Sequence, residues 1–462
     1  MNIDKLKICY IGGGSRNWAW VLMQDLAFEK EIGGTIELYD LKHDDAVTNE
    51  IIGNKLMAEH NEGKWKFHAN PSLGDALNAS DFVFISILPG DFEEMAVDVH
   101  MPEKFGIYQS VGDTAGAGGI IRALRTIGQF RDIAREIKKY APDAWVINYT
   151  NPMNICTRTL YKEFSQIKAF GCCHEVFHTQ KLLAKVIEEE KLADLGSIKR
   201  EEIKVNVLGI NHFTWIDKAF WNDIDIFPLY KKFCDKYSGT GFKDKSSKIE
   251  TDADTIERQK LFGSTDRVKM DLFRRYELIA AAGDRHLAEF CPPSWYLSSP
   301  QTAEDWGFAL TPVSWRIKDR EKLKEKAKSY REGLQTMTPV QSGEEGIKIV
   351  KALLGLSNLV TNVNLPNKGQ MPQIPAGAIA ETNAVFSKNK IEPVSANMLH
   401  VDLEALVMHH VLCYEGIIEA VFENDIEKAF RVFSHDYAVQ KLNLADARSL
   451  FNEMCAATKV KF

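Results

Sequence analysis

Short apolar segments alternate with helical patterns along the first half of the chain. The strand candidates are residues 7–11, 35–39, 81–87, 144–148, 167–171 and 203–208. Between them, apolar residues return every three or four positions, as over residues 121–140 and 175–190, and this spacing is typical of amphipathic helices. The alternation predicts an α/β fold with a doubly wound parallel sheet.

The second half has a different pattern. A polar, irregular segment at 242–266 is expected to be an inserted loop or an exposed helix. Helical patterns follow at 321–335 and 345–356, then a β-rich piece at 359–386, and helices from about Asp402 onward. We therefore predict a nucleotide-binding domain over residues 1–200 and a mixed α+β domain over 201–462, which would hold further catalytic, substrate and oligomer contacts.

Composition narrows the possible partners and the compartment. The net charge is −7, and neither a basic stripe nor a block of Lys and Arg stands out, which argues against nucleic acid or an anionic membrane as a partner. We find no secretory pattern at the N-terminus and no apolar run of 18 residues, so no membrane span is expected. The eight cysteines lack C-x-x-C spacing, which favours reduced thiols and a cytoplasmic protein.

A glycine-rich turn follows the first predicted strand. It contains Gly12, Gly14, Ser15 and Asn17, with Asn17 where the G-x-G-x-x-G pattern has its third glycine. Such a turn lets backbone N–H groups at a helix start approach a pyrophosphate. Asp40 ends the next strand, where a carboxylate can accept both ribose hydroxyls of NAD. The alternative is a tight turn that binds no nucleotide.

The stretch GCCHEVFHTQ contains H-E-x-x-H, with His174 and His178 one helical turn apart. On a helix this pattern is typical of zinc metalloproteases. Here it follows a predicted parallel strand, and ligand sites in such sheets lie at the carboxyl ends of strands. Cys173 is at that position, and His212 in GINHFTW ends another predicted strand. We therefore predict that Cys173 and His212 hold a metal, and that His178 packs or lies on the surface.

Three further motifs carry candidate site residues. The glycine-rich GDTAGAGGIIRALRT contains Asp113 and Arg122, and INYTNP ends in a turn with Asn151, whose amide can bond a cofactor or a sugar hydroxyl. In GDRHLAEF, Asp284 precedes Arg285. Asp284 is either a general base or half of a structural salt bridge with Arg285, and the residues alone leave both open.

These motifs, in this order, resemble glycoside hydrolase family 4. The resemblance rests on GGGS, GDTAGAGGIIRALRT, YTNP, GCCHE, GINHF, GDRHLAEF and VNLPNKGQMPQIP, and it covers essentially the whole chain. It implies a Rossmann-type domain similar to lactate and malate dehydrogenases, NAD as a cofactor that is not consumed, a divalent metal such as Mn²⁺, and a homodimer or homotetramer. Such enzymes are exceptions to the two-carboxylate glycosidase scheme.

The resemblance also implies roles for individual residues. NAD would take a hydride from C3 of the sugar, and the metal on Cys173 and His212 would bind the C2 and C3 oxygens. Asp284 corresponds to the base that removes the C2 proton, and Asp113 to the acid. His174 corresponds to a substrate contact.

The substrate is predicted from the branch of the family that the chain most resembles. The loop after residues 81–87 holds acidic residues that would repel a sugar phosphate. Together with CCHEVF and GDRHLAEF it most resembles the α-galacturonidase branch, which implies small oligogalacturonides as substrates. Arg285 or Arg122 would then meet the sugar carboxylate. The alternatives are an α-galactosidase of the same family and a hydroxy-acid dehydrogenase, although the latter gives no reason for the Cys173–His212 pair.

Overall fold

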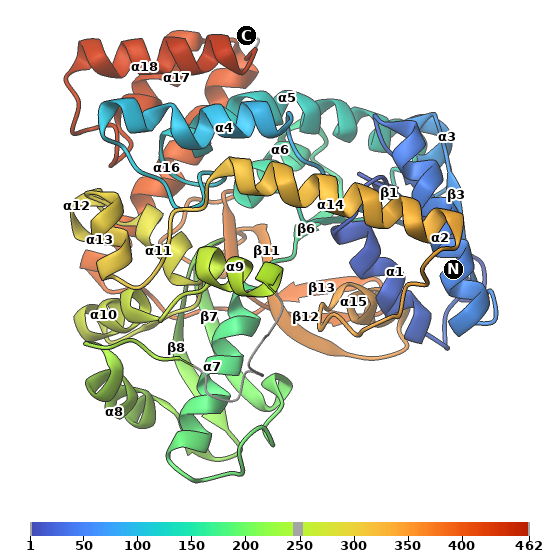
Figure 1. Ribbon diagram of the computed structural model, residues 1–462, viewed down its shortest axis with the longest axis horizontal. Helices are drawn as coiled ribbons and strands as arrows, with labels where there is room; N and C mark the ends of the chain where they lie inside the picture. Colours follow the sequence, from blue (N-terminus) through green and yellow to red (C-terminus); the bar gives the residue numbers. More distant parts are fainter. Residues whose placement is uncertain (1, 244–252, 461–462) are drawn as a thin grey trace.

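The central element is a nine-stranded sheet with helices on both faces (Figure 1). The computed structural model describes residues 2–243 and 253–460. In spatial order the strands are β13 (Lys390–Pro393), β12 (Ile379–Ser387), β11 (Leu359–Pro366), β6 (Lys168–Gly171), β5 (Trp145–Asn148), β4 (Phe82–Ile85), β1 (Leu6–Ile11), β2 (Gly34–Tyr39) and β3 (Trp65–Ala69). The six strands from β6 to β3 are parallel. Five of them are among the predicted strands, and β3 is not.

The helices of the first half connect these strands. They are α1 (Trp18–Phe28), α2 (His43–His60), α3 (Leu73–Leu77), α4 (Phe92–His100), the 3-10 turn η1 (Pro102–Phe105), α5 (Gly116–Tyr140), α6 (Met153–Glu163), α7 (Glu175–Glu189) and the 3-10 turn η2 (Arg200–Glu202). Successive residues of a strand face opposite sides. Accordingly Ile8 and Tyr10 of β1 pack in the core under α1 and α2, while Cys9 and Ile11 pack under α5 and α6.

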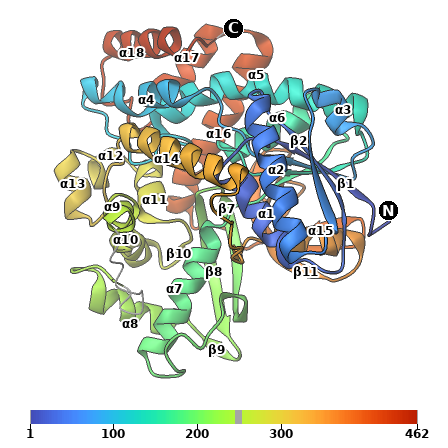
Figure 2. The same cartoon turned by 45° about the vertical axis from the view of Figure 1, so that its right-hand side comes forward.

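The second half contributes a smaller antiparallel sheet and most of the remaining helices. Its strands are β7 (Ile203–Ile210), β8 (Phe213–Trp221), β9 (Ile224–Asp225) and β10 (Ile279–Ala280). Its helices are α8 (Phe227–Tyr237), α9 (Ala253–Phe262), α10 (Arg267–Tyr276), α11 (Asp284–Phe290), α12 (Pro293–Tyr296), α13 (Pro300–Asp305), α14 (Val313–Glu332), α15 (Gly346–Leu354), α16 (Val401–Glu423), α17 (Ile426–Ser434) and α18 (Leu444–Ala457). Figure 2 shows α7, α8 and β7–β9 projecting together below the main sheet.

One predicted strand lies in a different sheet from the one expected. Residues 203–208 do form a strand, but β7 pairs antiparallel with β8 instead of continuing the parallel sheet. Only Asn211 and His212 separate the two strands, and His212 has a positive φ of 64°. Such a short connection can join only antiparallel neighbours, so the prediction for this strand was wrong about its sheet.

The β-rich piece of the second half joins the first sheet. β11 pairs with β12 and meets β6 at Asn364 and Gly171, both times antiparallel. The main sheet therefore contains strands from both halves of the chain. The predicted 200/201 boundary separates the helix-connected parallel strands from the rest of the sequence, and it stays a prediction.

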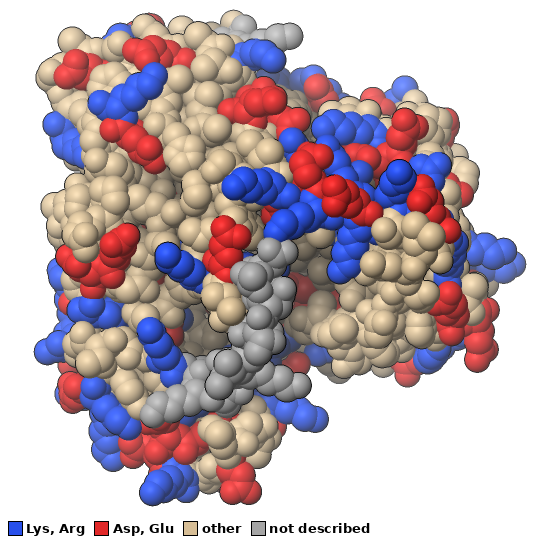
Figure 3. Space-filling model, in the orientation of Figure 1, with Lys and Arg blue, Asp and Glu red and all other residues tan. Residues whose placement is uncertain are grey.

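The closing helices pack over α5. By length and composition α16 alone among the described helices could span a membrane. In the fold it packs against α5, α6 and α17, and Leu403, Val407 and Val411 lie in the largest core cluster, so a core helix accounts for its apolar character. On the face in Figure 3, Lys and Arg alternate with Asp and Glu along α14.

Candidate active site

The glycine turn lies against the carboxyl ends of three neighbouring strands. Gly12 has a φ of +97°, and a Cβ there would lie 2.0 Å from the carbonyl oxygen of Ser86. The amide of Gly14 donates a hydrogen bond of 2.9 Å to Oδ2 of Asp40. A side chain at either glycine would fill the space between the strands, so the turn needs glycine at both positions.

Ser15 and Asn17 form the start of α1. Asn17 is the N-cap residue, but its side chain caps nothing. Instead Oγ of Ser15 accepts hydrogen bonds from the amides of Asn17 at 3.3 Å and Trp18 at 3.2 Å. The predicted third glycine position is thus a helix N-cap, where a β-carbon is tolerated.

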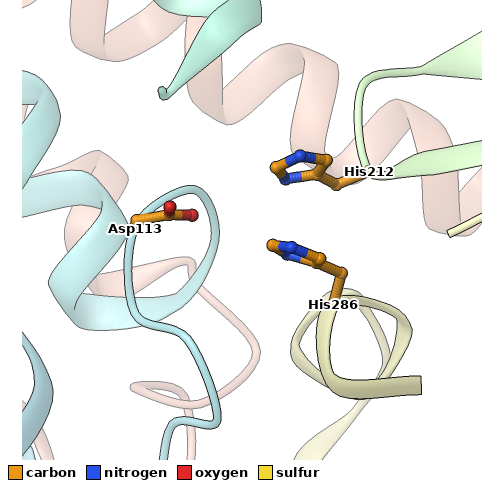
Figure 4. A group of neighbouring side chains, drawn as sticks. All are labelled: Asp113, His212 and His286. Carbon is orange, nitrogen blue, oxygen red and sulfur yellow. The ribbon is translucent and has the colours of Figure 1, made fainter. Parts of the chain in front are cut away.

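A group of two imidazoles and one carboxylate lies between the two halves of the chain, with His212 buried and the other two residues half-buried. Ligand atoms of Asp113, His212 and His286 all lie within 4.8 Å of one another. The ring centroids of His212 and His286 are 3.8 Å apart. Figure 4 shows Asp113, from the loop before α5, pointing toward the two rings. These three residues come from segments about 100 and 75 positions apart, so no local motif joins them.

The electrostatics of this group suit a divalent cation. Burial raises the pKa of Asp113, but His286, Arg122 and His212 outweigh it and lower the pKa to about 2. Burial and the neighbouring His286 lower the pKa of His212 to about 3, so its ring is neutral with a lone pair to donate. Nδ1 of His286 is buried without a hydrogen-bond partner among the described residues. An ionised carboxylate and neutral imidazoles are ligands that Mn²⁺ accepts.

Cys173 lies next to the turn that carries His212. The side chain of Asn211 and the amide of Glu175 hydrogen-bond its thiol. Burial and the carboxylates of Glu381 and Glu175 raise the pKa of the thiol well above its usual range. A cation bound beside it would act in the opposite direction and favour the thiolate.

The H-E-x-x-H residues form a second, shallower group. Ligand atoms of His174, Glu175 and His178 also lie within 4.8 Å of one another. The side chain of His178 is 56% exposed, and His174 contacts Glu344 at 3.3 Å. Glu175 does more than start a helix, since its Oε2 accepts a hydrogen bond of 2.7 Å from the amide of Gly283, next to α11.

Three arginines gather around Asp113. Arg122 of α5 is buried, and its Nε donates to the carbonyl oxygen of Asn151 at 3.2 Å. The Asn151 amide lies 3.5 Å from Oδ2 of Asp113. The structure thus brings both predicted residues to Asp113, and the backbone of the INYTNP turn orients the Arg122 guanidinium.

The other two arginines, Arg285 and Arg316, both lie over the aromatic ring of Phe262. Arg285 and Arg316 lie 4.9 and 5.3 Å from the ring centroid of Phe262. Nη2 of Arg285 donates to Thr311 Oγ1 at 2.6 Å and to the carbonyl oxygen of Ser110. Arg316, near the start of α14, is half-buried and has no hydrogen bond or ion pair to any residue that the structure describes.

Asp284 lies outside both histidine groups. It is fully buried, its Oδ1 accepts from the Lys269 amide at 3.0 Å, and its Oδ2 has no partner among the described residues. Burial, with help from Asp266, raises its pKa to about 6. No ion pair joins it to Arg285 in the described part of the chain, so the salt-bridge alternative receives no support.

Two buried carboxylates support the site: Glu289 belongs to the GDRHLAEF motif, and Glu381 is one that the sequence did not single out. Oε1 of Glu289 accepts the amides of Val111 at 2.6 Å and Gly112 at 2.9 Å, which holds the loop before Asp113. Burial raises the Glu289 pKa to about 7. Glu381 of β12 accepts from Thr214 Oγ1 at 2.8 Å, beside the β7–β8 turn.

Two further residues of the site, His286 and Arg316, were not assigned a role from the sequence. His286 stands inside the quoted GDRHLAEF motif, where its position two residues after Asp284 places it on the opposite side of α11. Arg316 follows no motif, and only the packing of α14 brings it to Asp113. The signal for His286 was therefore present in the sequence, and the signal for Arg316 was not.

Two family models match almost the whole chain. Residues 7–189 match the model described as family 4 glycosyl hydrolase, and residues 207–439 match the C-terminal domain of the same family. The first match ends near the end of α7, and the second begins inside β7.

Full-length relatives and solved structures agree with these matches. The α-galacturonidase of Thermoanaerobacterium saccharolyticum is 53% identical over 99% of this chain and 96% of its own length. That of Bacillus subtilis is 47% identical over 98% and 97%. A solved Bacillus subtilis structure, provisionally described as a glucosidase, has 46% identity and a TM-score of 0.91, and covers 97% of this chain and 99% of its own. A 6-phospho-α-glucosidase solved with NAD and Mn²⁺ has the same fold, with a TM-score of 0.80 at 18% identity over 98% of each chain.

Proposed function

Because the chain belongs to the family 4 glycosyl hydrolases, we propose that it is an α-galacturonidase that cleaves small, pectin-derived oligogalacturonides with the help of NAD and a divalent metal. Relatives named α-galacturonidase are 47–53% identical over almost the whole chain. An α-galactosidase of Bacillus subtilis is 25% identical over 98% of the chain. Similarity alone therefore favours an acidic sugar over a neutral one.

The observation that carries the proposal is the charge around Asp113. Three guanidinium groups, from Arg122, Arg285 and Arg316, act on this one carboxylate. Other carboxylates offset part of this charge, since Glu289 and Glu175 act on Arg285, Asp98 on Arg122 and Asp319 on Arg316. Three guanidinium groups beside one half-buried site still favour an anionic ligand, and a galacturonide brings a carboxylate.

The residues of the glycine turn fit NAD. The absence of side chains at Gly12 and Gly14 brings backbone close to the strand ends, where a pyrophosphate would lie at the start of α1. Asp40 already accepts amides of Gly14 and Lys42 at 2.9 Å each, and its remaining lone pairs suit ribose hydroxyls. When bound there, NAD supplies a reversible hydride acceptor.

The residues around His212 fit a divalent metal such as Mn²⁺. Cys173 and His212 would hold it, and the geometry adds Asp113 and His286 as further ligands. Bound there, the metal would polarise sugar oxygens. His174 and Asn151 flank this group and are expected to orient the sugar.

The roles of base and acid are proposed from the family resemblance and from the shifted pKa values of Asp284 and Asp113. The resemblance assigns to Asp284 the base that accepts the proton from C2 of the sugar, and burial raises the pKa of this carboxyl to about 6. Asp284 is fully buried and lies on the opposite side of α11 from His286, so this assignment rests on the resemblance. Asp113, with a pKa near 2, stays ionised at neutral pH. This favours a role as ligand over the acid role that the resemblance implies.

Assembly and location are proposed from the exposed apolar side chains and the free cysteines. We expect a homodimer or homotetramer, because exposed apolar side chains such as Met398, Val401 and Leu412 lie on and beside α16. The cysteines are free thiols, in keeping with a cytoplasmic enzyme. The mixed surface charge along α14 and the net charge of −7 give nucleic acid or membranes no basic surface to bind there.

Digalacturonate and melibiose test the proposal directly. Each is incubated with the enzyme, NAD⁺, Mn²⁺ and a thiol reductant in D₂O. We expect cleavage of digalacturonate, with deuterium at C2 of the released sugar, and its loss when NAD⁺ is omitted or EDTA is added. Cleavage of melibiose alone would favour the α-galactosidase alternative. Cleavage without C2 exchange, or without NAD⁺, would contradict the proposed chemistry.

A further inference from the structure

We propose that Arg316, on α14, forms the ion pair with the carboxylate of the sugar and so sets the preference for an acidic over a neutral galactoside. The inference rests on the proposed function and adds a specificity residue to it. The earlier candidates for this role were Arg122 and Arg285. The geometry points to the third arginine, which no motif in the sequence singles out.

The three guanidinium groups share one neighbourhood. Arg316 acts electrostatically on Asp113, on Arg122 and on Arg285. Burial lowers the pKa of Arg316, while the Asp113 carboxylate acts to raise it. Arg316 and Arg285 lie over the same ring of Phe262, and Arg285 is hydrogen-bonded to Ser110 in the loop before Asp113. The guanidinium of Arg316 therefore lies beside that loop, with Asp319 of its own helix as a further charged neighbour.

Arg122 and Arg285 already have partners in the protein. The Nε of Arg122 is bonded to Asn151, which positions the turn at the end of β5. Arg285 bonds Thr311 and the backbone of Ser110, so it ties α11 to the loop before Asp113. Each keeps one buried nitrogen without a partner among the described residues, Nη1 of Arg122 and Nε of Arg285, but moving either guanidinium onto a substrate would break the contacts that its other nitrogens make.

By contrast, no other residue of the described chain holds the guanidinium of Arg316 through a hydrogen bond. Among the described residues it makes no hydrogen bond and no ion pair, and its one specific contact is the face of Phe262 at 5.3 Å. The guanidinium plane stays free to take a carboxylate through two parallel N–H···O bonds, the geometry for which arginine is suited. The aromatic ring limits its motion before the substrate arrives.

The charges around Arg316 also favour this residue as the one that binds the sugar carboxylate. An arginine that is half-buried, unpaired and next to two other cations is unfavourable in the free enzyme. A bound carboxylate would relieve this repulsion, whereas a neutral sugar with a C6 hydroxyl would leave it in place. The arrangement thus favours acidic substrates and also disfavours neutral ones.

The test compares Arg316→Met with wild type on two substrates that differ only in charge. One is digalacturonate, and the other is digalacturonate with the carboxylate of the non-reducing residue methylated. The holoenzyme is assayed with saturating NAD⁺ and Mn²⁺. Lys318→Met, an exposed change on the same helix, is the matched control, and Arg316→Lys keeps the charge without the planar fork.

We expect Arg316→Met to lower kcat/KM for digalacturonate by about 10²-fold, mainly through KM, and to change kcat/KM for the ester by less than about threefold. Arg316→Lys should recover part of the loss, and Lys318→Met should behave as wild type. NAD⁺ affinity and thermal stability should stay unchanged.

Equal losses on both substrates would show that Arg316 acts on the fold or the chemistry rather than on the carboxylate, and no loss on either would exclude it. In both cases the proposed function stands, because wild type cleaves digalacturonate. If wild type itself does not cleave it, the proposed function fails, and the role of Arg316 fails with it.

Discussion

The described part of the chain contains two groups of histidine and carboxylate side chains that could hold a metal ion, and they differ in how they are assembled and in how exposed they are. The Asp113–His212–His286 group is assembled from three distant segments and lies deep between the halves of the chain. The His174–Glu175–His178 group comes from a single helical turn, and its third member is largely exposed. The familiar sequence motif marks the shallow group, while the three members of the deep group come from three separate motifs, one residue from each.

The difference shows what a motif can and cannot say about chemistry. Spacing along a helix brings side chains together wherever the helix lies, so H-E-x-x-H is satisfied at the surface as well as in a cleft. A buried, partly unpaired set of ligands is rarer, because unpaired polar groups cost free energy unless a ligand completes them. We therefore expect the chemistry in the deep group.

Loss of His212 should have the largest effect. His212→Ala removes a central ligand of the deep group, and a metal typically supplies several kcal/mol to a transition state. We expect kcat to fall by about 10³-fold or more. Mn²⁺ affinity, measured by calorimetry on the NAD-loaded protein, should weaken in parallel.

Cys173→Ser is the companion change, because it keeps the size of the ligand and alters its softness. It should lower Mn²⁺ affinity less than His212→Ala does. Retention of full metal affinity by both variants would move the metal away from the deep group and contradict the comparison.

Asp284→Asn should come next in size. If Asp284 is the general base, kcat falls by about 10²- to 10⁴-fold, and deuterium exchange at C2 falls with it, while NAD⁺ and Mn²⁺ still bind. Its hydrogen bond to the Lys269 amide survives in the asparagine variant, so the fold is expected to persist.

A purely structural Asp284 would give the opposite pattern. Asp284→Asn would then change the melting temperature and leave C2 exchange near the wild-type rate. That outcome would leave the base to another group facing the deep cluster, with Glu175 the first candidate because its carboxylate acts on His286 and His212.

The sequence predicts the fold better than the site, for physical reasons. Each parallel strand is a local apolar run, so five strands of the main sheet and the glycine turn at Gly12 were predictable from short windows. The pairing of β11 with β6 joins residues nearly 200 positions apart, and nothing local encodes it. Likewise His212 and Cys173 stand at strand ends, whereas Arg316 reaches Asp113 only through the tertiary packing of α14.

Glu289→Gln should change how the free energy of unfolding depends on pH, because Glu289 is buried next to the deep group. The folded pKa of Glu289, about 7, lies above its ordinary value, so its contribution is fully present below about pH 4.5 and is lost as pH rises through 7. Glutamine cannot ionise. From pH 5 to pH 8 the free energy of unfolding of wild type should therefore fall relative to the variant, by on the order of 2 kcal/mol.

Urea denaturation of the metal-free protein at the two pH values measures this difference. Glu325→Gln, an exposed change on α14, is the control and should show no pH-dependent difference from wild type. If Glu289→Gln and Glu325→Gln showed the same pH-dependent difference from wild type, Glu289 would not have a raised pKa in the folded protein. Glu289 would then be less buried than its contacts with Val111 and Gly112 indicate.

His178→Gln should have the smallest effect and so separates the two groups most sharply. The H-E-x-x-H interpretation makes His178 a metal ligand, and its loss would then lower kcat as strongly as the loss of His212. The side chain of His178 is 56% exposed, so glutamine can replace it with little change in packing. We expect kcat/KM and Mn²⁺ affinity within about threefold of wild type. If kcat/KM or Mn²⁺ affinity fell by 10²-fold or more, the metal would bind at the shallow group. The deep group alone would then not explain the metal dependence.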